Sequence, residues 1–187
     1  MRITGGRLRG RRLQAPPGNA VRPTSDRVRQ ALFNVLAHAA WAGTERLQNE
    51  VVLDAFCGSG ALGLEAVSHG AARAFFMDTH PAALRAARAN AAALGVIERC
   101  RFLRTDACNP PGANEAAGLV LLDPPYAKTG DVPDRAARAL GSLGVAGWFA
   151  PGALIVVETV PGWQPPGGFA VLDARRYGET LITVLNA

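Results

Sequence analysis

The tetrapeptide Asp123-Pro124-Pro125-Tyr126 is the part of this sequence whose residue types and spacing are most suited to chemistry. The exocyclic amino group of guanine or adenine is a poor nucleophile, because its lone pair is delocalised into the ring. The Asp123 side chain and the Pro124 carbonyl can each accept one N–H of such a group, and two successive prolines hold these acceptors in place. Tyr126 offers an aromatic face on which an extruded base can stack. A rigid Pro-Pro turn without a ligand is the alternative interpretation.

A second motif, rich in glycine, joins an apolar run to a segment with helical spacing. Gly58, Gly60 and Gly63 fit the pattern GxGxxG directly after residues 51–55. Glycine lets the backbone turn sharply and approach a ligand closely. By itself this pattern is equally typical of NAD-binding domains, so the ligand has to be inferred from neighbouring residues.

Two carboxylates near the ends of predicted strands, Asp54 and Asp106, favour S-adenosylmethionine over a dinucleotide. Asp54 lies four residues before Gly58, where its charge disfavours pyrophosphate but suits the sulfonium and ammonium groups of S-adenosylmethionine. Asp78 can accept hydrogen bonds from ribose hydroxyls with either ligand, and Asp106 can accept one from the adenine amino group. The alternatives are that Asp54 caps the following helix and that Asp106 forms a turn. The residues expected to bind S-adenosylmethionine are Asp54, Phe56, Gly58, Ser59, Gly60, Asp78, Thr79 and Asp106.

Together the two motifs predict the transfer of a methyl group to an amino nitrogen. A methyl on a sulfonium is already activated, so alignment of sulfur, carbon and nitrogen should supply much of the catalysis. Asp123 can also take up the proton that the nitrogen loses, and the sequence does not separate this role from orientation. The expected catalytic residues are Asp123, Pro124, Pro125 and Tyr126.

Alternating strands and helices are needed to bring these motifs to one edge of a sheet. The sequence predicts strands over 51–55, 74–78, 101–105, 119–123, 153–158, 169–174 and 180–185, and helices over 62–69, 81–94 and 132–143. This alternation is typical of an α/β fold with a doubly wound, mainly parallel seven-stranded sheet that is Rossmann-like. Taken with the two motifs, it predicts the class I S-adenosylmethionine-dependent methyltransferase fold. Gly178 predicts a tight turn and an antiparallel end to the sheet.

The N-terminal part of the chain is strongly basic. The net charge is +5, yet residues 1–29 hold eight arginines and one acid, a local charge of +7, so the remaining residues sum to −2. The segment predicts a hairpin over 1–4 and 11–14. Pro23-Thr24-Ser25-Asp26 then supplies N-cap chemistry for a helix that runs to about Ala40, and Asp26 either caps this helix or pairs with an arginine.

This charge asymmetry indicates a polyanionic partner, with nucleic acid favoured over a membrane. A solvated surface run is the alternative. We therefore predict an RNA-binding extension over residues 1–40 and a methyltransferase domain over 41–187. The arginines expected to contact RNA are Arg2, Arg7, Arg9, Arg11, Arg12, Arg22, Arg27 and Arg29.

Composition argues against several other classes of protein. Cys57, Cys100 and Cys108 show neither a disulfide framework nor the spacing of a metal site, so no metal is expected. The basic start lacks the apolar segment of a signal peptide, and no apolar run reaches membrane-spanning length. A soluble cytoplasmic protein is expected.

With these motifs in view, the chain resembles the bacterial small-subunit rRNA guanine-N2 methyltransferases (the RsmD family) over nearly its whole length. The resemblance implies methylation of N2 of one guanine in 16S rRNA, within the small ribosomal subunit or an assembly intermediate. A monomer is expected. It implies that Asp54, Gly58, Gly60, Asp78 and Asp106 hold the cofactor and that residues 123–126 hold the guanine. The segments that carry it are Arg2-Ile3-Thr4-Gly5-Gly6, Arg9-Gly10-Arg11, Arg22-Pro23-Thr24-Ser25-Asp26-Arg27-Val28-Arg29, Leu32-Phe33-Asn34, Asp54-Ala55-Phe56, residues 58–66, Leu122-Asp123-Pro124-Pro125-Tyr126, Tyr177-Gly178 and Thr180-Leu181.

The departures from the family pattern are small, and several rival functions remain open. Gln30 stands where glutamate is expected and Cys57 where alanine is expected. The rivals are an adenine-N6 DNA methyltransferase, an NAD-dependent oxidoreductase and a non-catalytic RNA-binding module. A glutamine methyltransferase acting on protein is a fourth, but that group uses Asn-Pro-Pro-Tyr, whereas position 123 here is aspartate.

Overall fold

The computed structural model describes residues 1–16, 25–39, 41, 47–125 and 134–187. The predictions for Arg22 and Tyr126 concern residues outside these ranges. The helices are α1 (Asp26–His38), α2 (Ala61–Ser68), α3 (Pro81–Ala93) and α4 (Arg135–Val145), with short 3-10 turns η1 (Gly6–Leu8) and η2 (Ile97–Arg99). The strands are β1 (Val51–Asp54), β2 (Arg73–Asp78), β3 (Cys100–Arg104), β4 (Ala117–Leu122), β5 (Phe149–Thr159), β6 (Ala170–Tyr177) and β7 (Thr180–Asn186).

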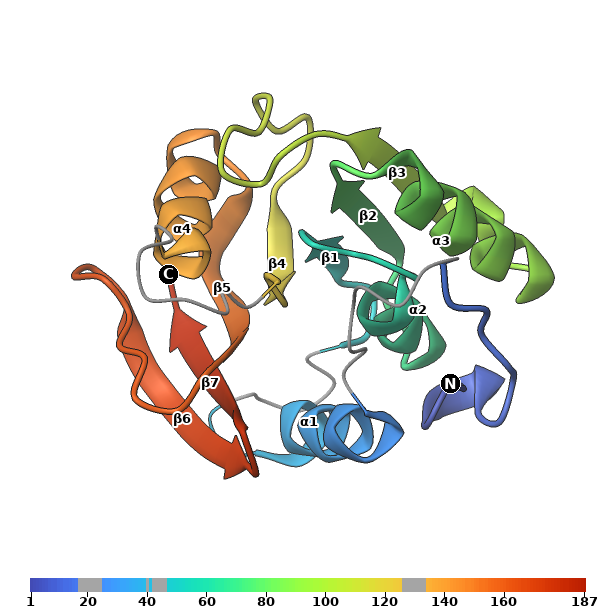
Figure 1. Ribbon diagram of the computed structural model, residues 1–187, viewed down its shortest axis with the longest axis horizontal. Helices are drawn as coiled ribbons and strands as arrows, with labels where there is room; N and C mark the ends of the chain where they lie inside the picture. The colour runs from blue at the N-terminus through green and yellow to red at the C-terminus, as the bar shows by residue number, and fades with distance from the viewer. Residues whose placement is uncertain (17–24, 40, 42–46, 126–133) are drawn as a thin grey trace.

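The strands form one seven-stranded sheet in the order β3-β2-β1-β4-β5-β7-β6 (Figure 1). The first five positions in this order pair in parallel, and β7 pairs antiparallel with both β5 and β6. Gly178, with φ of +65°, makes the tight turn between β6 and β7. The predicted α/β fold with an antiparallel end to the sheet is therefore confirmed.

Strand β5 starts earlier than the sequence indicates. Its predicted start was residue 153, but it begins at Phe149, which pairs with Ala117 before the register shifts. Pro151 and Gly152 interrupt the apolar pattern at this irregular point, so the sequence indicates a loop where the first residues of β5 lie.

Helices cover both faces of the sheet. Successive residues of each strand point to opposite faces, so each strand contributes side chains to two cores. Leu121 and Val156 belong to one hydrophobic core with side chains of α1, α2 and α3. Their neighbours Leu122 and Val157 belong to a second core with side chains of α4. This arrangement places the helices in layers on either side of the sheet.

The N-terminal segment, residues 1–16, has little regular secondary structure but packs into the first of these cores. Arg2 and Arg12 form an isolated antiparallel bridge, and η1 closes the turn between them. Ile3 and Leu13 are buried with side chains of α1 and α2. The predicted hairpin is thus present as one bridge, and the segment shares its core with the rest of the chain.

Helix α1 begins where the Pro-Thr-Ser-Asp sequence predicts. Its N-cap is Ser25, whose Oγ accepts a hydrogen bond from the N–H of Val28 at 3.3 Å. Asp26 instead forms an ion pair with Arg29 at 2.8 Å, which settles the choice between capping and pairing. In the described part of the chain, no helix combines the length and apolar character that crossing a membrane requires.

Candidate active site

The two sequence motifs meet at the carboxyl ends of adjacent strands. Asp54, the last residue of β1, pairs in register with Leu121 of β4, and Asp123 follows two residues later. Neighbouring strands are about 4.8 Å apart, so the glycine loop and the Asp-Pro-Pro turn start side by side. β1 lies between β2 and β4, so the strand order reverses its direction at β1 (Figure 1). Ligands of α/β folds bind at such a switch point, outside the carboxyl ends of the strands.

Two backbone hydrogen bonds attach the loop after β1 to the strands on either side of it. The N–H of Ala55 donates to the Leu121 carbonyl of β4, and the N–H of Cys57 donates to the Met77 carbonyl of β2, both at 2.9 Å. The loop is therefore an extension of the sheet edge with a fixed position. Phe56, between these two anchors, is half-buried.

The glycines of the loop have different roles. Gly58 and Gly60 have φ values of +50° and +77°, which favour glycine. A Cβ at Gly58 would meet no described atom within 4 Å, so the backbone there faces open space that a ligand can approach. A Cβ at Gly60 would lie 3.0 Å from the Ala87 Cβ, so this glycine instead allows α3 to pack closely.

Gly63 is needed for packing, and its replacement by alanine should destabilise the protein. An added Cβ would lie 2.5 Å from Phe76 Cε1, and the Phe76 ring is backed by Phe102 at a centroid distance of 5.1 Å. We expect a loss of about 1–3 kcal/mol in unfolding free energy, measured by urea denaturation. Gly141→Ala in α4 is the control, because its Cβ meets nothing within 4 Å and should stabilise the helix by about 0.5–1 kcal/mol. Equal effects of the two substitutions would contradict this assignment.

Asp54 is fully buried and has one carboxylate oxygen available. Its Oδ2 accepts the N–H of Gly63 at 2.9 Å, so the predicted alternative of helix capping holds for this atom. Its Oδ1 is also buried but has no hydrogen-bond partner among the described residues. Burial raises the pKa of Asp54 to about 7, with a further increase from Asp78 and a decrease from the Gly63 hydrogen bond. A buried, unsatisfied carboxylate oxygen beside open backbone fits the ammonium group of a bound amino-acid moiety.

Replacing Asp54 by asparagine should reduce the pH dependence of stability of the ligand-free protein. The unfolded chain releases the Asp54 proton near the ordinary value of 3.8, whereas the folded protein keeps it up to about pH 7. The stability of the wild type should therefore fall as the pH rises through this interval. We expect the difference in unfolding free energy across this interval to shrink in the variant, measured by urea denaturation. Identical pH profiles for the two proteins would rule out a proton on Asp54.

Asp78 closes β2 beside the same loop. Its Oδ2 accepts the N–H of Gly58 at 3.0 Å, and its Oδ1 accepts the N–H of His80 at 2.8 Å. Thr79 is exposed, and its hydroxyl lies 3.1 Å from the His80 Nδ1. Asp78 thus fixes the position of Gly58 and remains half-buried, within reach of a ligand hydroxyl.

Asp106 forms a turn, which was the alternative to its predicted role as an acceptor for the adenine amino group. Its Oδ1 accepts the N–H of Cys108 at 2.9 Å and also a hydrogen bond from Arg135 Nη2 at 3.0 Å. The Arg135 guanidinium lies 5.6 Å from the centroid of the Phe56 ring. Sequence reasoning missed Arg135, which comes 29 positions later and lies in the first turn of α4. An adenine amino group that approaches Asp106 would meet this arginine as a competing donor.

Asn90 is a second residue that the sequence analysis missed. It is buried in α3, where its Nδ2 donates to the carbonyls of Ser59 and Gln14, both at 2.9 Å, and its Oδ1 accepts the N–H of Gln14. The Ser59 hydroxyl lies 3.8 Å from the Met1 sulfur. The Ser59 carbonyl is thus already bonded to Asn90, whereas its hydroxyl has only this long contact with sulfur.

Comparison with known proteins identifies the family to which the chain belongs. Residues 1–186 match the model of one protein family, described as Conserved hypothetical protein 95. The chain belongs to this family. It is 35% identical over 160 residues to ribosomal RNA small subunit methyltransferase D of Escherichia coli K12, covering 85% of this chain and 74% of that protein. The protein of that name from Haemophilus influenzae is 32% identical over 167 residues, covering 85% and 78%.

The solved structures agree with this family. A structure from Escherichia coli described as a methyltransferase, yhhF, superposes with a TM-score of 0.79 at 31% identity and covers 100% of this chain and 97% of that one. The chain is thus a methyltransferase, and the class I fold predicted from the sequence is confirmed. In this family member the described residues hold no group of three or more side chains suited to a metal ion.

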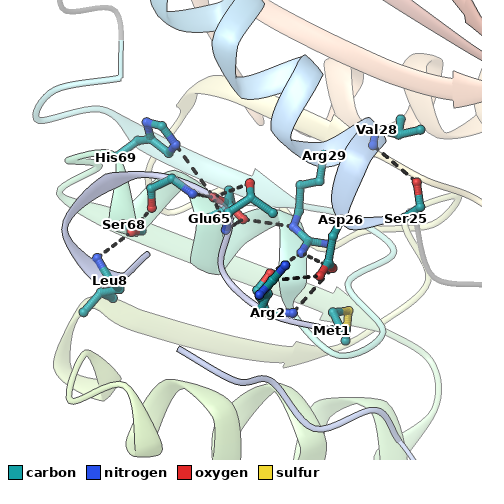
Figure 2. Close-up of polar contacts among 12 residues, drawn as sticks. Met1, Arg2, Leu8, Ser25, Asp26, Val28, Arg29, Glu65, Ser68 and His69 are labelled. Carbon is teal, nitrogen blue, oxygen red and sulfur yellow. Dashed lines mark hydrogen bonds and ion pairs between the residues drawn. The ribbon is translucent and has the colours of Figure 1, made fainter. Parts of the chain in front are cut away.

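The prediction that Arg29 of this methyltransferase contacts RNA is wrong. Its side chain is fully buried, and its Nε donates to Glu65 Oε2 at 2.9 Å (Figure 2). Its Nη2 donates to Asp26 Oδ1 at 2.8 Å and to the Arg2 carbonyl. A guanidinium enclosed by these partners is structural, since it has no surface to offer to a phosphate.

Glu65 of α2 is the centre of this buried network, and sequence analysis missed it as well. Its carboxylate accepts hydrogen bonds from the N–H of Thr4 at 2.9 Å and of Gly5 at 2.6 Å, in addition to Arg29 (Figure 2). Ser68, one turn later, accepts the N–H of Leu8 at 2.9 Å. The sequence does carry a signal for this network, namely a single acidic residue in the otherwise apolar helix 61–68. A charged side chain in such a helix is buried only when it has partners. The network docks the N-terminal segment onto the helix that follows the glycine loop.

Six of the eight arginines predicted to contact RNA remain exposed in this methyltransferase. Arg11 donates from Nη2 to the Ala93 carbonyl at 2.6 Å, which places it at the C-terminal end of α3. Arg2 lies 3.8 Å from Asp26, so its charge is partly compensated. The exposed set consists of Arg2, Arg7, Arg9, Arg11, Arg12 and Arg27.

Proposed function

We propose that this protein transfers a methyl group from S-adenosylmethionine to the exocyclic N2 of a guanine in 16S rRNA of the small ribosomal subunit. The observation that carries the proposal is the pairing of Asp54 with Leu121, which starts the glycine loop and the Asp-Pro-Pro turn on neighbouring strands. The names of the two ribosomal RNA small subunit methyltransferases support the choice of substrate.

The residues around the glycine loop fit this cofactor. The unsatisfied Oδ1 of Asp54 would accept from the ammonium group, and the open backbone at Gly58 would allow close approach. Asp78 would accept from the ribose hydroxyls, and Asp106 from the adenine amino group once Arg135 shares or leaves its carboxylate. When bound, S-adenosylmethionine supplies an activated methyl group on a positively charged sulfur.

The Asp-Pro-Pro turn would orient the guanine. The Asp123 side chain and the Pro124 carbonyl each accept one N–H of the amino group, which directs its lone pair away from the ring plane. Pro124 is buried and Pro125 exposed, so the turn is anchored on the sheet side and open on the other. Proximity and orientation then contribute most of the rate, and Asp123 also provides a carboxylate to which the nitrogen can pass its proton.

The remaining parts of the proposal concern the partner and its setting. The exposed arginines of residues 1–40 would bind phosphates of the rRNA, while residues 41–187 would carry out the transfer. We propose a monomer that acts in the cytoplasm on the small subunit or on an assembly intermediate.

Transfer from labelled S-adenosylmethionine tests this function directly. Small subunits that lack the methyl mark, DNA and a protein extract are offered as parallel substrates, and the products are identified by nucleoside mass spectrometry. We expect label in N2-methylguanosine of 16S rRNA. Label confined to DNA adenine or to protein would exclude the proposal, and so would calorimetry that detects binding of NAD but not of S-adenosylmethionine.

A further inference from the structure

A second basic surface lies outside the N-terminal segment. Residues 81–104, from α3 to β3, hold five arginines and one acid, Glu98, a local charge of +4. This contrasts with the −2 of the whole chain after residue 29. All five arginines are exposed: Arg85, Arg88, Arg99, Arg101 and Arg104. We call them the α3–β3 surface.

Neutral groups hold two of these arginines, Arg88 and Arg101, in place without compensating their charges. The Arg88 guanidinium lies 4.7 Å from the centroid of the Phe102 ring, and Phe102 itself stacks on Phe76. Arg101 Nη1 donates to the carbonyls of Glu98 at 3.2 Å and Cys100 at 3.0 Å. Guanidinium groups held this way lose less conformational entropy when they bind an anion.

Three arginines elsewhere in the fold are paired with carboxylates instead. Arg73, Arg135 and Arg175 each form an ion pair with a carboxylate, at Glu115, Asp106 and Asp173 respectively. In the described part of the chain, no carboxylate lies within 4.0 Å of a nitrogen of the α3–β3 arginines. The α3–β3 surface therefore has positive charge available for a partner.

The α3–β3 surface joins the N-terminal arginines to the edge that holds the candidate active site. Arg11 binds the carbonyl of Ala93 at the end of α3, and Figure 1 shows the N-terminal segment on the same side of the molecule as α3. At the other end, Arg104 pairs in register with Asp78, which closes β2 beside the glycine loop. β3 is an edge strand, so its outer side is not covered by another strand.

The chemistry of the α3–β3 surface favours a polyanion over a protein partner. Protein interfaces are anchored by exposed apolar or aromatic side chains at their centre. The large exposed hydrophobic residues in the described part of the chain are Val145, Val160 and Val171, none of which belongs to residues 81–104. Alanines such as Ala89 and Ala92 lie between the arginines instead.

We propose that the α3–β3 surface is a second phosphate-binding surface for RNA, continuous with the N-terminal arginines. The inference rests on the proposed function, because it assigns a wider footprint to the same RNA substrate. It adds contacts on the cofactor side of the active site, so the RNA would wrap around the β3 edge of the sheet.

The test compares two pairs of arginines on opposite edges of the sheet. Arg85→Gln/Arg104→Gln removes two charges from the α3–β3 surface, and Arg175→Gln/Arg176→Gln removes two charges from β6 as the control. Affinity for protein-free 16S rRNA is measured over a series of salt concentrations. We expect the slope of log K against log salt to become smaller by about 1–2 in the first variant and to stay unchanged in the control. Arg85→Lys/Arg104→Lys should keep the wild-type slope.

Separate measurements distinguish failure of this inference from failure of the proposed function. We expect the first variant to keep wild-type calorimetric binding of S-adenosylmethionine and wild-type kcat at saturating small subunits, with a raised KM. A wild-type slope in this variant overturns the inference while the methylation assay still supports the function. Loss of binding to assembled subunits but not to protein-free rRNA also overturns it, since the partner would then be a ribosomal protein. A wild-type enzyme that methylates no rRNA defeats the proposed function itself.

Discussion

Replacing Asp123 by alanine should lower the kcat for rRNA methylation by roughly 10²–10⁴-fold, the range typical for removal of a group that orients a nucleophile and takes up its proton. The side chain lies at the end of β4, at the level of the loop after β1, and it is only half-buried. Its loss should remove one of two acceptors for the guanine amino group without touching Asp54 or Asp78. Single-turnover methylation of small subunits measures the effect, and calorimetry should give nearly unchanged binding of S-adenosylmethionine.

Asp123→Asn separates the two roles that the sequence left open. An asparagine keeps one acceptor oxygen but provides no base, so a variant with substantial activity would assign orientation as the main role. Activity as low as that of the alanine variant would assign the proton to Asp123. Thermal unfolding of both variants provides the control for folding. Unchanged kcat in Asp123→Ala would contradict the proposed active site.

Replacing Glu65 by alanine should destabilise the protein by about 3–5 kcal/mol, the usual result of removing one partner of a buried ion pair. The substitution leaves the buried Arg29 guanidinium without its buried counter-ion, and it removes the acceptor for the N–H groups of Thr4 and Gly5. For a chain of this length we expect a fall in Tm of roughly 10 °C. Glu98→Ala, at an exposed acid, should stay within about 0.5 kcal/mol of the wild type. Similar losses in both variants would contradict the network.

The same carboxylate should make the wild type sensitive to acid. Desolvation raises the pKa of Glu65, but the nearby His69, 3.7 Å away, and the hydrogen bonds from Thr4 and Arg29 together lower it below the ordinary 4.5. A lowered pKa contributes stability above the unfolded value, and this contribution is lost as the pH falls through the folded value. Glu65→Gln should therefore show a smaller loss of unfolding free energy below about pH 4.5 than the wild type, measured by denaturant titration.

The parts of the molecule that could be predicted depend on local patterns. Continuous apolar runs indicated the parallel strands, and parallel strands end at one edge, so the convergence of Asp54, Asp78 and Asp123 followed from sequence order. The start of β5 was missed because Pro151 and Gly152 obscure an irregular pairing. These elements are specified by residues close together in the chain.

The errors concern contacts between residues far apart in the chain. Arg29 was assigned to RNA because it ends a run of arginines, whereas its contact with Glu65, 36 positions later, is one that the sequence pattern does not show. The role of Asp106 likewise depends on Arg135, which follows it by 29 positions. Sequence patterns predicted which residues reach the site edge, whereas the pairing of charges required the folded chain.

The docking of the first residues has a consequence for synthesis of the protein. Thr4 binds Glu65, Gln14 binds Asn90 and Arg11 binds Ala93, over separations of 61, 76 and 82 positions. The N-terminal arginines therefore leave the ribosome long before the helices that receive them. During translation this cationic segment cannot complete its docking until α3 has emerged, so its placement depends on contacts between residues far apart in the chain.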